Sequence, residues 1–239
     1  MYKIATGKTR KKQTLITLKR PDGTITETME ETIGLMLEHL FPEDDPQTDT
    51  DQQKGVRRQT EQPVNTKEDR EFTQDEVRQA LEVFKDKKAP GPNGLTNGIV
   101  KMVFKAIPKT MTQMYNECLK TGHFPKKLKM AKILMITKPG REGNSEPSMY
   151  GPVSLLNTEG KIMEKLLIQR IMHHLYKTEA LNGNQYGFTP QKNMVDAAME
   201  VKQFIEPHLK RGGVAIMASL DIQEAFGSAW WPTILKGLR

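Results

Sequence analysis

The stretch Leu220-Asp221-Ile222-Gln223-Glu224-Ala225-Phe226 directly follows an apolar run at residues 214–220. A short, continuous apolar run of this kind predicts a buried strand, which would present the Asp221 carboxylate at its C-terminal end. Enzymes that use two metal ions hold them about 4 Å apart, between carboxylates on rigid elements. Because one aspartate cannot hold two metals, the stretch predicts half of a two-metal nucleotidyl-transfer site.

The charge of the chain is positive and unevenly distributed. The chain has 239 residues, with 36 Lys and Arg against 29 Asp and Glu, which gives a formal net charge of +7. Residues 85–142 alone hold 13 Lys and Arg against 3 Asp and Glu, a local excess of +10. This excess favours a polyanionic partner such as nucleic acid, although a solubilising lysine-rich surface would give the same signal.

The cysteine content and the hydropathy pattern limit the class of protein. The single cysteine, Cys118, excludes a disulfide within the chain and fits a reducing compartment. No apolar run approaches the roughly 18 residues of a membrane span, and the first residues lack the apolar stretch of a signal peptide. We therefore expect an intracellular protein that does not enter a membrane.

The first 71 residues divide into a connector, residues 1–42, and a linker, residues 43–71. In the connector, the turn Arg20-Pro21-Asp22-Gly23 predicts a hairpin, because proline fixes φ and glycine accepts a positive φ. An apolar face then predicts a helix from Ile33 to Leu40. The linker has little to bury, which predicts disorder. Its Asp44-Asp45 pair lacks flanking strand residues and indicates solvated charge rather than a metal site.

Ordered structure is predicted again from Phe72 onward. Thr73-Gln74-Asp75-Glu76 is a capping box, which marks the start of a helix. Further helices are predicted from Pro108 to the residue before Gly122, over residues 160–176, and over residues 193–205 up to Pro207. Residues 133–136 predict a strand. Since helices predominate and the strands are few and separate, the fold class is α+β.

From Phe72 onward the order of landmarks resembles the reverse transcriptase of non-LTR (LINE-type) retrotransposons, particularly the arthropod elements that insert into ribosomal RNA genes. Seven short pieces occur in one order over about two-thirds of the chain. They are Lys87-Lys88-Ala89-Pro90-Gly91-Pro92-Asn93-Gly94, Gly122-His123-Phe124-Pro125, Ile136-Thr137-Lys138-Pro139-Gly140, Tyr150-Gly151-Pro152-Val153-Ser154-Leu155-Leu156, Gly160-Lys161-Ile162-Met163-Glu164-Lys165, Gln185-Tyr186-Gly187-Phe188, and the Asp221 stretch closed by Trp230-Trp231-Pro232. The resemblance implies that residues 72–239 form the fingers and the first palm strand of an incomplete right-hand polymerase fold, preceded by the connector that follows the endonuclease domain in such polyproteins.

The resemblance also implies roles for single residues at the site of nucleotide addition. Asp221 resembles the first metal-binding aspartate, with the backbone carbonyl of Ile222 as a second ligand, and such hard oxygen donors suit Mg²⁺. Phe226 resembles the bulky residue that excludes a ribose 2′-hydroxyl and so selects deoxynucleotides. Lys138, at the tip of a fingers hairpin, resembles the cation that meets the triphosphate, and Gln185 looks like a residue near the nucleotide pocket.

A second group of residues is implied to contact nucleic acid. The loop with Lys87, Lys88, Gly91 and Asn93 would approach the RNA backbone, since bare glycines and cations suit phosphate contact. Two further lysines, Lys126 and Lys127, belong to the same basic region. The partners implied by the resemblance are an RNA template, a DNA primer, deoxynucleotides and the remainder of a polyprotein. The implied localisation is the nucleus and the cytoplasm, with no targeting signal in the sequence.

Several of these residues also allow structural interpretations. Asp221 could be a helix cap after a strand, and Gln185 could simply satisfy backbone groups. Lys138-Pro139-Gly140 could be only a turn. Phe226 could be a plain core residue, and core packing is the preferred interpretation of Trp230-Trp231 and of Cys118.

The chain also departs from the family pattern. Glycine stands at 151 where the family usually has an arginine that contacts the triphosphate, and Asn93 replaces an aspartate. A tryptophan is expected near Leu128 and an aspartate at Gly227. No hairpin with two adjacent aspartates follows Asp221. We therefore expect a polymerase fragment that is inactive as this chain, or alternatively a non-catalytic nucleic-acid-binding relic of such an element.

Overall fold

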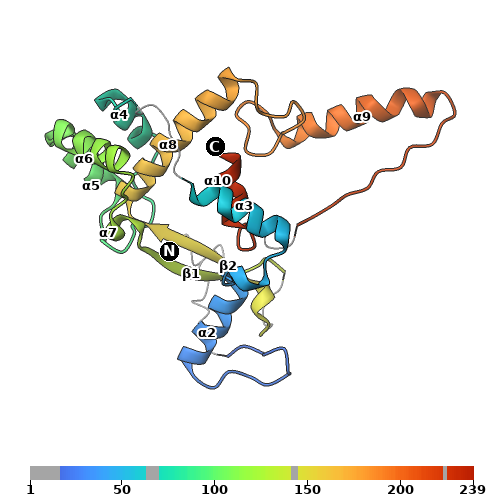
Figure 1. Ribbon diagram of the computed structural model, residues 1–239, viewed down its shortest axis with the longest axis horizontal. Coiled ribbons are helices and arrows are strands. Elements are labelled where there is room, and N and C mark those ends of the chain that lie inside the picture. The colour runs from blue at the N-terminus through green and yellow to red at the C-terminus, as the bar shows by residue number, and fades with distance from the viewer. Residues whose placement is uncertain (1–16, 63–69, 141–144, 223–224) are drawn as a thin grey trace, which may run out of the picture.

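The computed structural model describes residues 17–62, 70–140, 145–222 and 225–239. Figure 1 shows a group of helices beside a two-stranded hairpin, with one long helix that extends away from both. The fold is a mixture of helices and strands, in agreement with the α+β class. In the described ranges no helix combines the length and the apolar character that a membrane crossing requires.

The main core lies between four helices. They are α4 (Gln74–Glu82), α5 (Asn97–Ala106), α6 (Pro108–Thr121) and α8 (Thr158–Lys177). The buried side chains of this core are Phe72, Val77, Ala80, Leu81, Val100, Phe104, Met111, Tyr115, Cys118, Ile162, Met163 and Leu166. Burying this apolar surface is the main driving force for the packing of these helices. Cys118 is a core residue, as expected.

The signals that predict the ends of these helices are confirmed. Thr73 and Glu76 form the capping box, with the Thr73 N–H donating to the Glu76 carboxylate at 2.7 Å and the Glu76 N–H to the Thr73 hydroxyl at 3.2 Å. Pro108 opens α6, and Gly122 ends it in the left-handed conformation with φ of +61°. The capping box and the Gly122 N–H, which donates to the Leu119 carbonyl, satisfy backbone groups that the helices leave without partners. Pro108 has no N–H that would need a partner.

The hairpin connects this core to the connector. Its strands, β1 (Ala131–Thr137) and β2 (Tyr150–Leu156), are antiparallel, and Ala131 pairs with Leu156. The predicted strand at 133–136 is part of β1. Met135 and Tyr150, on one face of the hairpin, pack against a small second core. This second core consists of Leu18, Met36 and Leu40, the last two on α2 (Met29–Leu40). The predicted connector hairpin is reduced to one bridge, between Lys19 and Ile25. The part of the connector before Thr17 lies outside the described residues.

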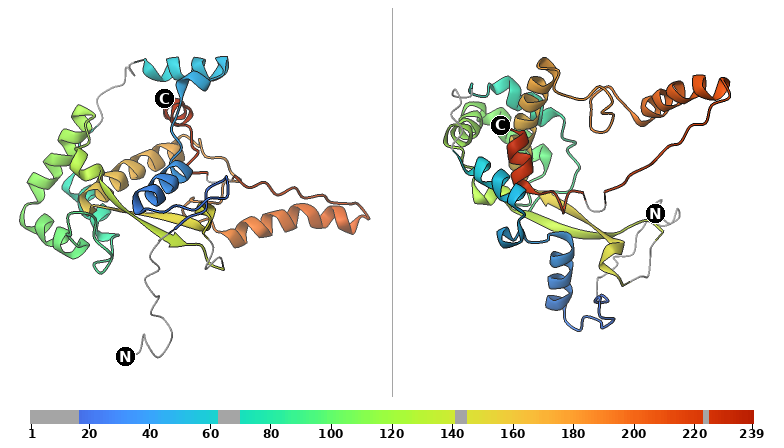
Figure 2. Two further views of the ribbon diagram at one scale, coloured as in Figure 1. Left: turned by 90° about the horizontal axis from the view of Figure 1, so that it is seen from below. Right: turned by 45° about the vertical axis from the view of Figure 1, so that its right-hand side comes forward.

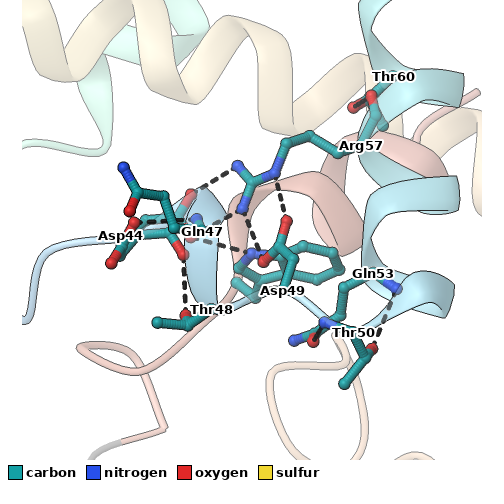
Figure 3. A network of polar contacts seen from close by, with 10 residues as sticks. Asp44, Gln47, Thr48, Asp49, Thr50, Gln53, Arg57 and Thr60 are labelled. Carbon is teal, nitrogen blue, oxygen red and sulfur yellow. Dashed lines mark hydrogen bonds and ion pairs between the residues drawn. The ribbon is translucent and has the colours of Figure 1, made fainter.

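The linker differs from its predicted disorder. It contains the short 3-10 helix η1 (Pro46–Thr48) and the helix α3 (Asp51–Glu61), which starts at a capping box of Thr50 and Gln53. The guanidinium of Arg57 binds the carboxylates of Asp44 and Asp49 at 2.8 and 2.7 Å (Figure 3). Composition alone misses this helix because ion pairs and the cap, and not apolar burial, hold it. Residues 63–69 lie outside the description.

The predicted strand at residues 214–220 is also absent. These residues are extended but unpaired and exposed, with Ile216 at 93% and Leu220 at 94% of full exposure. They follow α9 (Met194–Lys210), which extends away from the rest of the chain and continues through Pro207, where the sequence predicted its end (Figures 1 and 2). A strand needs a neighbour to pair its backbone groups, and β1 and β2 pair only with each other among the described residues.

The last described element, α10 (Trp231–Gly237), packs against α3. The indole N–H of Trp230 donates to the Asp44 carboxylate at 3.2 Å, and the Arg57 guanidinium lies 5.4 Å from the centre of the Trp230 ring. Trp231 is 68% exposed, so the preference for core packing is wrong for this residue. The contact links the linker to the segment that follows Asp221.

Candidate nucleic-acid interface

The buried side chain of Asn157, the residue before α8, joins two basic segments. Its carbonyl oxygen accepts a hydrogen bond from the backbone N–H of Asn93 at 3.1 Å, and its amide donates to the backbone carbonyl of Lys127 at 3.0 Å. An asparagine in this position normally caps its own helix, but here no cap hydrogen bond forms. Asn157 instead holds the loop that bears Lys87 and Lys88 next to α7 (Lys126–Lys129).

Two glycines allow these segments to approach the start of α8. A Cβ on Gly91 would lie 2.5 Å from the backbone nitrogen of Asn157, and a Cβ on Gly160 would lie 2.5 Å from the carbonyl oxygen of Leu128. Both distances are far shorter than any carbon contact allows, so only glycine fits at either position. The tryptophan expected near Leu128 is replaced by a leucine whose backbone touches α8.

Asn93 makes a second connection between its loop and α8. Its side-chain amide donates to both carboxylate oxygens of Glu159, at 3.3 and 3.1 Å. The Glu159 backbone carbonyl in turn accepts from the hydroxyl of Tyr115 at 3.2 Å. Burial, with the Glu159 charge as a smaller cause, raises the pKa of Tyr115 far above its usual range, so this hydroxyl stays protonated and keeps its hydrogen bond.

The lysines of these two segments are exposed and have no counter-ions among the described residues. Lys87, Lys88, Lys126 and Lys127 are all exposed. Within the described ranges, no carboxylate forms an ion pair with any of the four. The acidic residue of the same loop, Asp86, is paired with Lys101 at 2.7 Å instead. The structure thus connects, through Asn157, the two segments that carry the six predicted nucleic-acid residues.

Lys138 lies just beyond the end of β1, on the hairpin. Its N–H donates to the carbonyl of Met149 and its ammonium group to the carbonyl of Ser148, both at 2.8 Å. Side chains alternate between the two faces of a strand, and Gly151 pairs with Ile136. Gly151 therefore belongs to the same face as Lys138. A Cβ on Gly151 would meet nothing nearer than the Ile136 carbonyl oxygen, at 4.0 Å, so this face has room for a side chain.

Phe226 lies against the Gln185–Phe188 segment. The rings of Phe226 and Phe188 meet edge to face, with their centres 6.4 Å apart, and both rings are largely exposed. Gln185 donates its amide to the carbonyl of Gly187 at 2.8 Å, which is the backbone-satisfying role that the sequence left open. No hydrogen bond or ion pair in the described part of the chain connects these residues with Lys138.

Asp221 is exposed on the unpaired segment. The donors at this point, its carboxylate and the Ile222 carbonyl, are hard oxygens of the kind that Mg²⁺ prefers. However, the described residues contain no group of three or more His, Cys, Asp or Glu side chains that would hold a metal. One carboxylate does not fit two ions, so the donors at this point correspond to half of a two-metal site.

Three residues of this region were missed as site residues by the sequence reasoning. Asn157 and Glu159 were missed because a residue at the start of a helix usually serves that helix, and nothing local indicates a partner 64 positions away. Lys161 was quoted only as part of a motif. The signal that could have identified Lys161 was its position in the first turn of α8, next to Gly160, which contacts α7.

Comparison with known proteins finds one family and several relatives that match this chain. Residues 136–239 match the family described as reverse transcriptase (RNA-dependent DNA polymerase). The whole chain is 28% identical over 239 residues to the retrovirus-related Pol polyprotein from type-1 retrotransposable element R1 of Bradysia coprophila, and spans 22% of that protein.

Two further relatives cover most of the chain. The RNA-directed DNA polymerase from mobile element jockey of Drosophila funebris is 34% identical over 163 residues, which are 68% of this chain and 18% of that protein. The probable RNA-directed DNA polymerase from transposon BS of Drosophila melanogaster is 28% identical over 165 residues, 69% of this chain and 18% of that protein. The chain thus spans about a fifth of the length of these relatives.

Proposed function

Because the chain belongs to the reverse transcriptase family of non-LTR retrotransposons, we propose that it supplies the part of an RNA-directed DNA polymerase that holds the template and primer. The observation that carries this proposal is the attachment of two lysine segments, at 87–88 and 126–127, to one buried residue, Asn157. Neither segment has an ion pair with a residue that the structure describes. Cations held in a fixed arrangement, without counter-ions, bind a phosphate backbone without a preference for sequence.

The partners in this proposal are an RNA template and a DNA primer. Lysines that contact phosphates release counter-ions from the nucleic acid, so the affinity falls steeply as salt rises. Asp86 is paired with Lys101, and Glu159 accepts hydrogen bonds from Asn93. Among the described residues, neither carboxylate forms an ion pair with Lys87, Lys88, Lys126 or Lys127.

The finer roles concern the incoming nucleotide. We assign Lys138 to the triphosphate, Phe226 to the exclusion of a ribose 2′-hydroxyl, and Gln185 to the edge of the nucleotide pocket. The contact of Phe226 with Phe188 supports the last two assignments, because it joins the segments that carry them. When bound, Mg²⁺ would be held by the Asp221 carboxylate and the Ile222 carbonyl and would neutralise phosphate charge.

A second candidate function is binding of nucleic acid without synthesis. It is favoured by the position of Asp221 on an exposed, unpaired segment with no metal-binding cluster among the described residues. It is also favoured by Gly151, which removes a cation from the face of the hairpin that carries Lys138. In this function the chain uses only the lysine region, which consists of Lys87, Lys88, Lys126 and Lys127.

Two assays on the 239-residue chain separate these functions. Fluorescence anisotropy with a labelled RNA–DNA template–primer tests binding, and we expect binding that weakens with salt. Primer extension with Mg²⁺ and deoxynucleotides tests synthesis, with Asp221→Ala as the control. We expect no incorporation above this control. Extension that the substitution abolishes would establish synthesis by this chain, and an absence of any binding would refute both functions.

A further inference from the structure

A cavity of about 410 Å³ lies beside the lysine region and has no assigned role. Its charged lining consists of Lys85, Lys88 and Lys161, and its apolar lining includes Phe84 and Leu155. Asn97, which is buried, also lines the cavity. The cavity therefore combines three cations with an apolar wall, which matches the phosphates and the sugars of a nucleic-acid strand.

The three ammonium groups have no acidic partners. In the described portions of the chain, no hydrogen bond or ion pair is formed by the ammonium groups of Lys85, Lys88 and Lys161. Lys161 is moreover partly buried, so water screens its charge less than that of an exposed lysine. Like charges around one cavity repel each other, and an anionic ligand would remove this repulsion.

Hydrogen bonds hold the walls of the cavity in place. The amide of Asn97 donates to the Lys85 carbonyl at 2.7 Å, and the carbonyl oxygen of the same side chain accepts from the Thr158 hydroxyl at 2.8 Å. Thr158 is the first residue of α8, and Lys161 follows it by less than one helical turn. The backbone that carries Lys85 is thereby fixed to the helix that carries Lys161.

We propose that this cavity binds consecutive backbone phosphates of a single-stranded nucleic acid and that Lys161 is a further binding residue. The inference rests on the proposed function, because it names the path of the strand on the same basic region. A strand of nucleic acid suits the cavity better than a bare phosphate ion, because the apolar wall offers contact for sugars between the charges.

The face of the hairpin extends this path. Lys132 pairs with Leu155, which lines the cavity, so the two belong to the same side of the hairpin. Alternation places Lys138 on this side as well, six residues further along, or about 20 Å at the rise of a strand. The strand would thus run from the cavity along the hairpin toward the residue assigned to the triphosphate.

Chemical footprinting of lysines tests the proposal directly. The 239-residue chain is acetylated with and without a saturating single-stranded RNA of about 16 nucleotides, and each lysine is quantified by mass spectrometry. We expect the RNA to protect Lys85, Lys88 and Lys161 but not Lys109 or Lys202. Equal modification of Lys161 with and without the bound RNA would overturn the proposal.

A pair of substitutions on α8 provides a second measurement. Lys161→Ala should weaken RNA binding several-fold at fixed salt and lower the slope of log affinity against log salt by about 0.7. Lys161→Arg should keep most of the affinity. Lys165→Ala removes the same charge one turn further along the helix and should change neither quantity. Equal affinities for Lys161→Ala and Lys165→Ala would overturn the proposal.

The outcomes separate this proposal from the function on which it rests. A wild-type chain that binds no RNA overturns both. A wild-type chain that binds RNA, with Lys161 neither protected nor sensitive to substitution, overturns only the cavity. Adding a nucleoside triphosphate distinguishes the source of the phosphates: if the triphosphate protects Lys161 and the RNA does not, the assignment to a phosphodiester strand is wrong.

Discussion

The side-chain amide of Asn93 spans the two carboxylate oxygens of Glu159, at 3.1 and 3.3 Å, and so fastens the lysine loop to α8. The resemblance predicts an aspartate at this position, and in this chain an aspartate would face Glu159 as a like charge. The change to asparagine thus fits its surroundings, because the amide donates where a carboxylate would repel.

We predict that Asn93→Asp destabilises the chain at neutral pH, by about 1.5–3 kcal/mol for a lost hydrogen bond to a charged group. The substitution sets two carboxylates against each other, and they repel only while both are ionised. The penalty should therefore shrink as the pH falls below about 5 and the carboxylates take up protons. Urea unfolding at neutral and acidic pH measures this change.

The double variant Asn93→Asp with Glu159→Gln serves as the control for this prediction. It restores one amide and one carboxylate in exchanged positions, and we expect it to recover most of the loss. A double variant as unstable as the single one would show that the two side chains do not interact.

The pairing of Glu76 predicts a second pH dependence. Partial burial by itself raises the pKa of Glu76, but hydrogen bonds from Thr73 and the nearby Arg170 outweigh this effect and bring the pKa below its ordinary 4.5. A lowered folded-state pKa stabilises the fold above 4.5, and this stabilisation is lost as the pH falls through the folded-state pKa. Glu76→Gln should therefore be less stable than wild type at pH 7, and the two should converge in acid.

Thermal unfolding followed by circular dichroism at several pH values tests the role of Glu76. Glu82→Gln is a suitable control, since Glu82 lies at the other end of α4 and makes no ion pair with a described residue. A difference between Glu76→Gln and wild type that persists unchanged at low pH would contradict the titration.

The ion pairs of Arg57 predict a local loss of protection. Arg57 binds Asp44 and Asp49, and the Asp49 side chain is only 5% exposed, so Arg57→Ala leaves a buried carboxylate without its partner (Figure 3). We expect faster hydrogen exchange in α3 and in α10, with no change in α4–α6. Arg57→Lys should show an intermediate effect, because an ammonium group keeps the positive charge but cannot make the bidentate contacts of a guanidinium. Unchanged exchange in α10 would contradict the link between the two helices.

The open face at Gly151 predicts a gain of binding. An arginine at this position meets no atom within 4 Å of its Cβ except the Ile136 carbonyl oxygen, and belongs to the same face as Lys138. Gly151→Arg should therefore leave stability within about 0.5 kcal/mol of wild type, as surface substitutions do. It should also tighten the binding of a deoxynucleoside triphosphate, measured by calorimetry. Gly151→Gln, which adds length without charge, should not tighten it.

Local signals in the sequence predicted local structure well. The capping box at Thr73, the helix stop at Gly122 and the apolar face that buries Cys118 are all confirmed. Each depends on residues within one or two turns of a helix, where spacing determines which side chains and backbone groups meet. The family was also recognisable, because seven short motifs occur in a fixed order.

Features that depend on distant partners were not predicted. Residues 214–220 have the composition of a buried strand, but the structure shows them extended and exposed, since no described strand pairs with them. The helix α3 was missed because its Arg57 is paired with Asp44 and Asp49, which precede the helix, and composition does not reveal these ion pairs. The role of Asn157 depends on residues 30 and 64 positions away, and no periodicity connects them.

The central claim is that lysines held around Asn157 bind the phosphate backbone, and the salt dependence of RNA binding tests it most directly. The measurement compares wild type with a variant in which Lys87, Lys88, Lys126 and Lys127 are Ala, and with a control in which Lys105, Lys109, Lys120 and Lys202 are Ala. Both variants lose the same charge. We predict that the slope of log affinity against log salt, between about 50 and 200 mM, falls by up to about 3 in the first variant and little in the control. Equal slopes for the two variants would contradict the account.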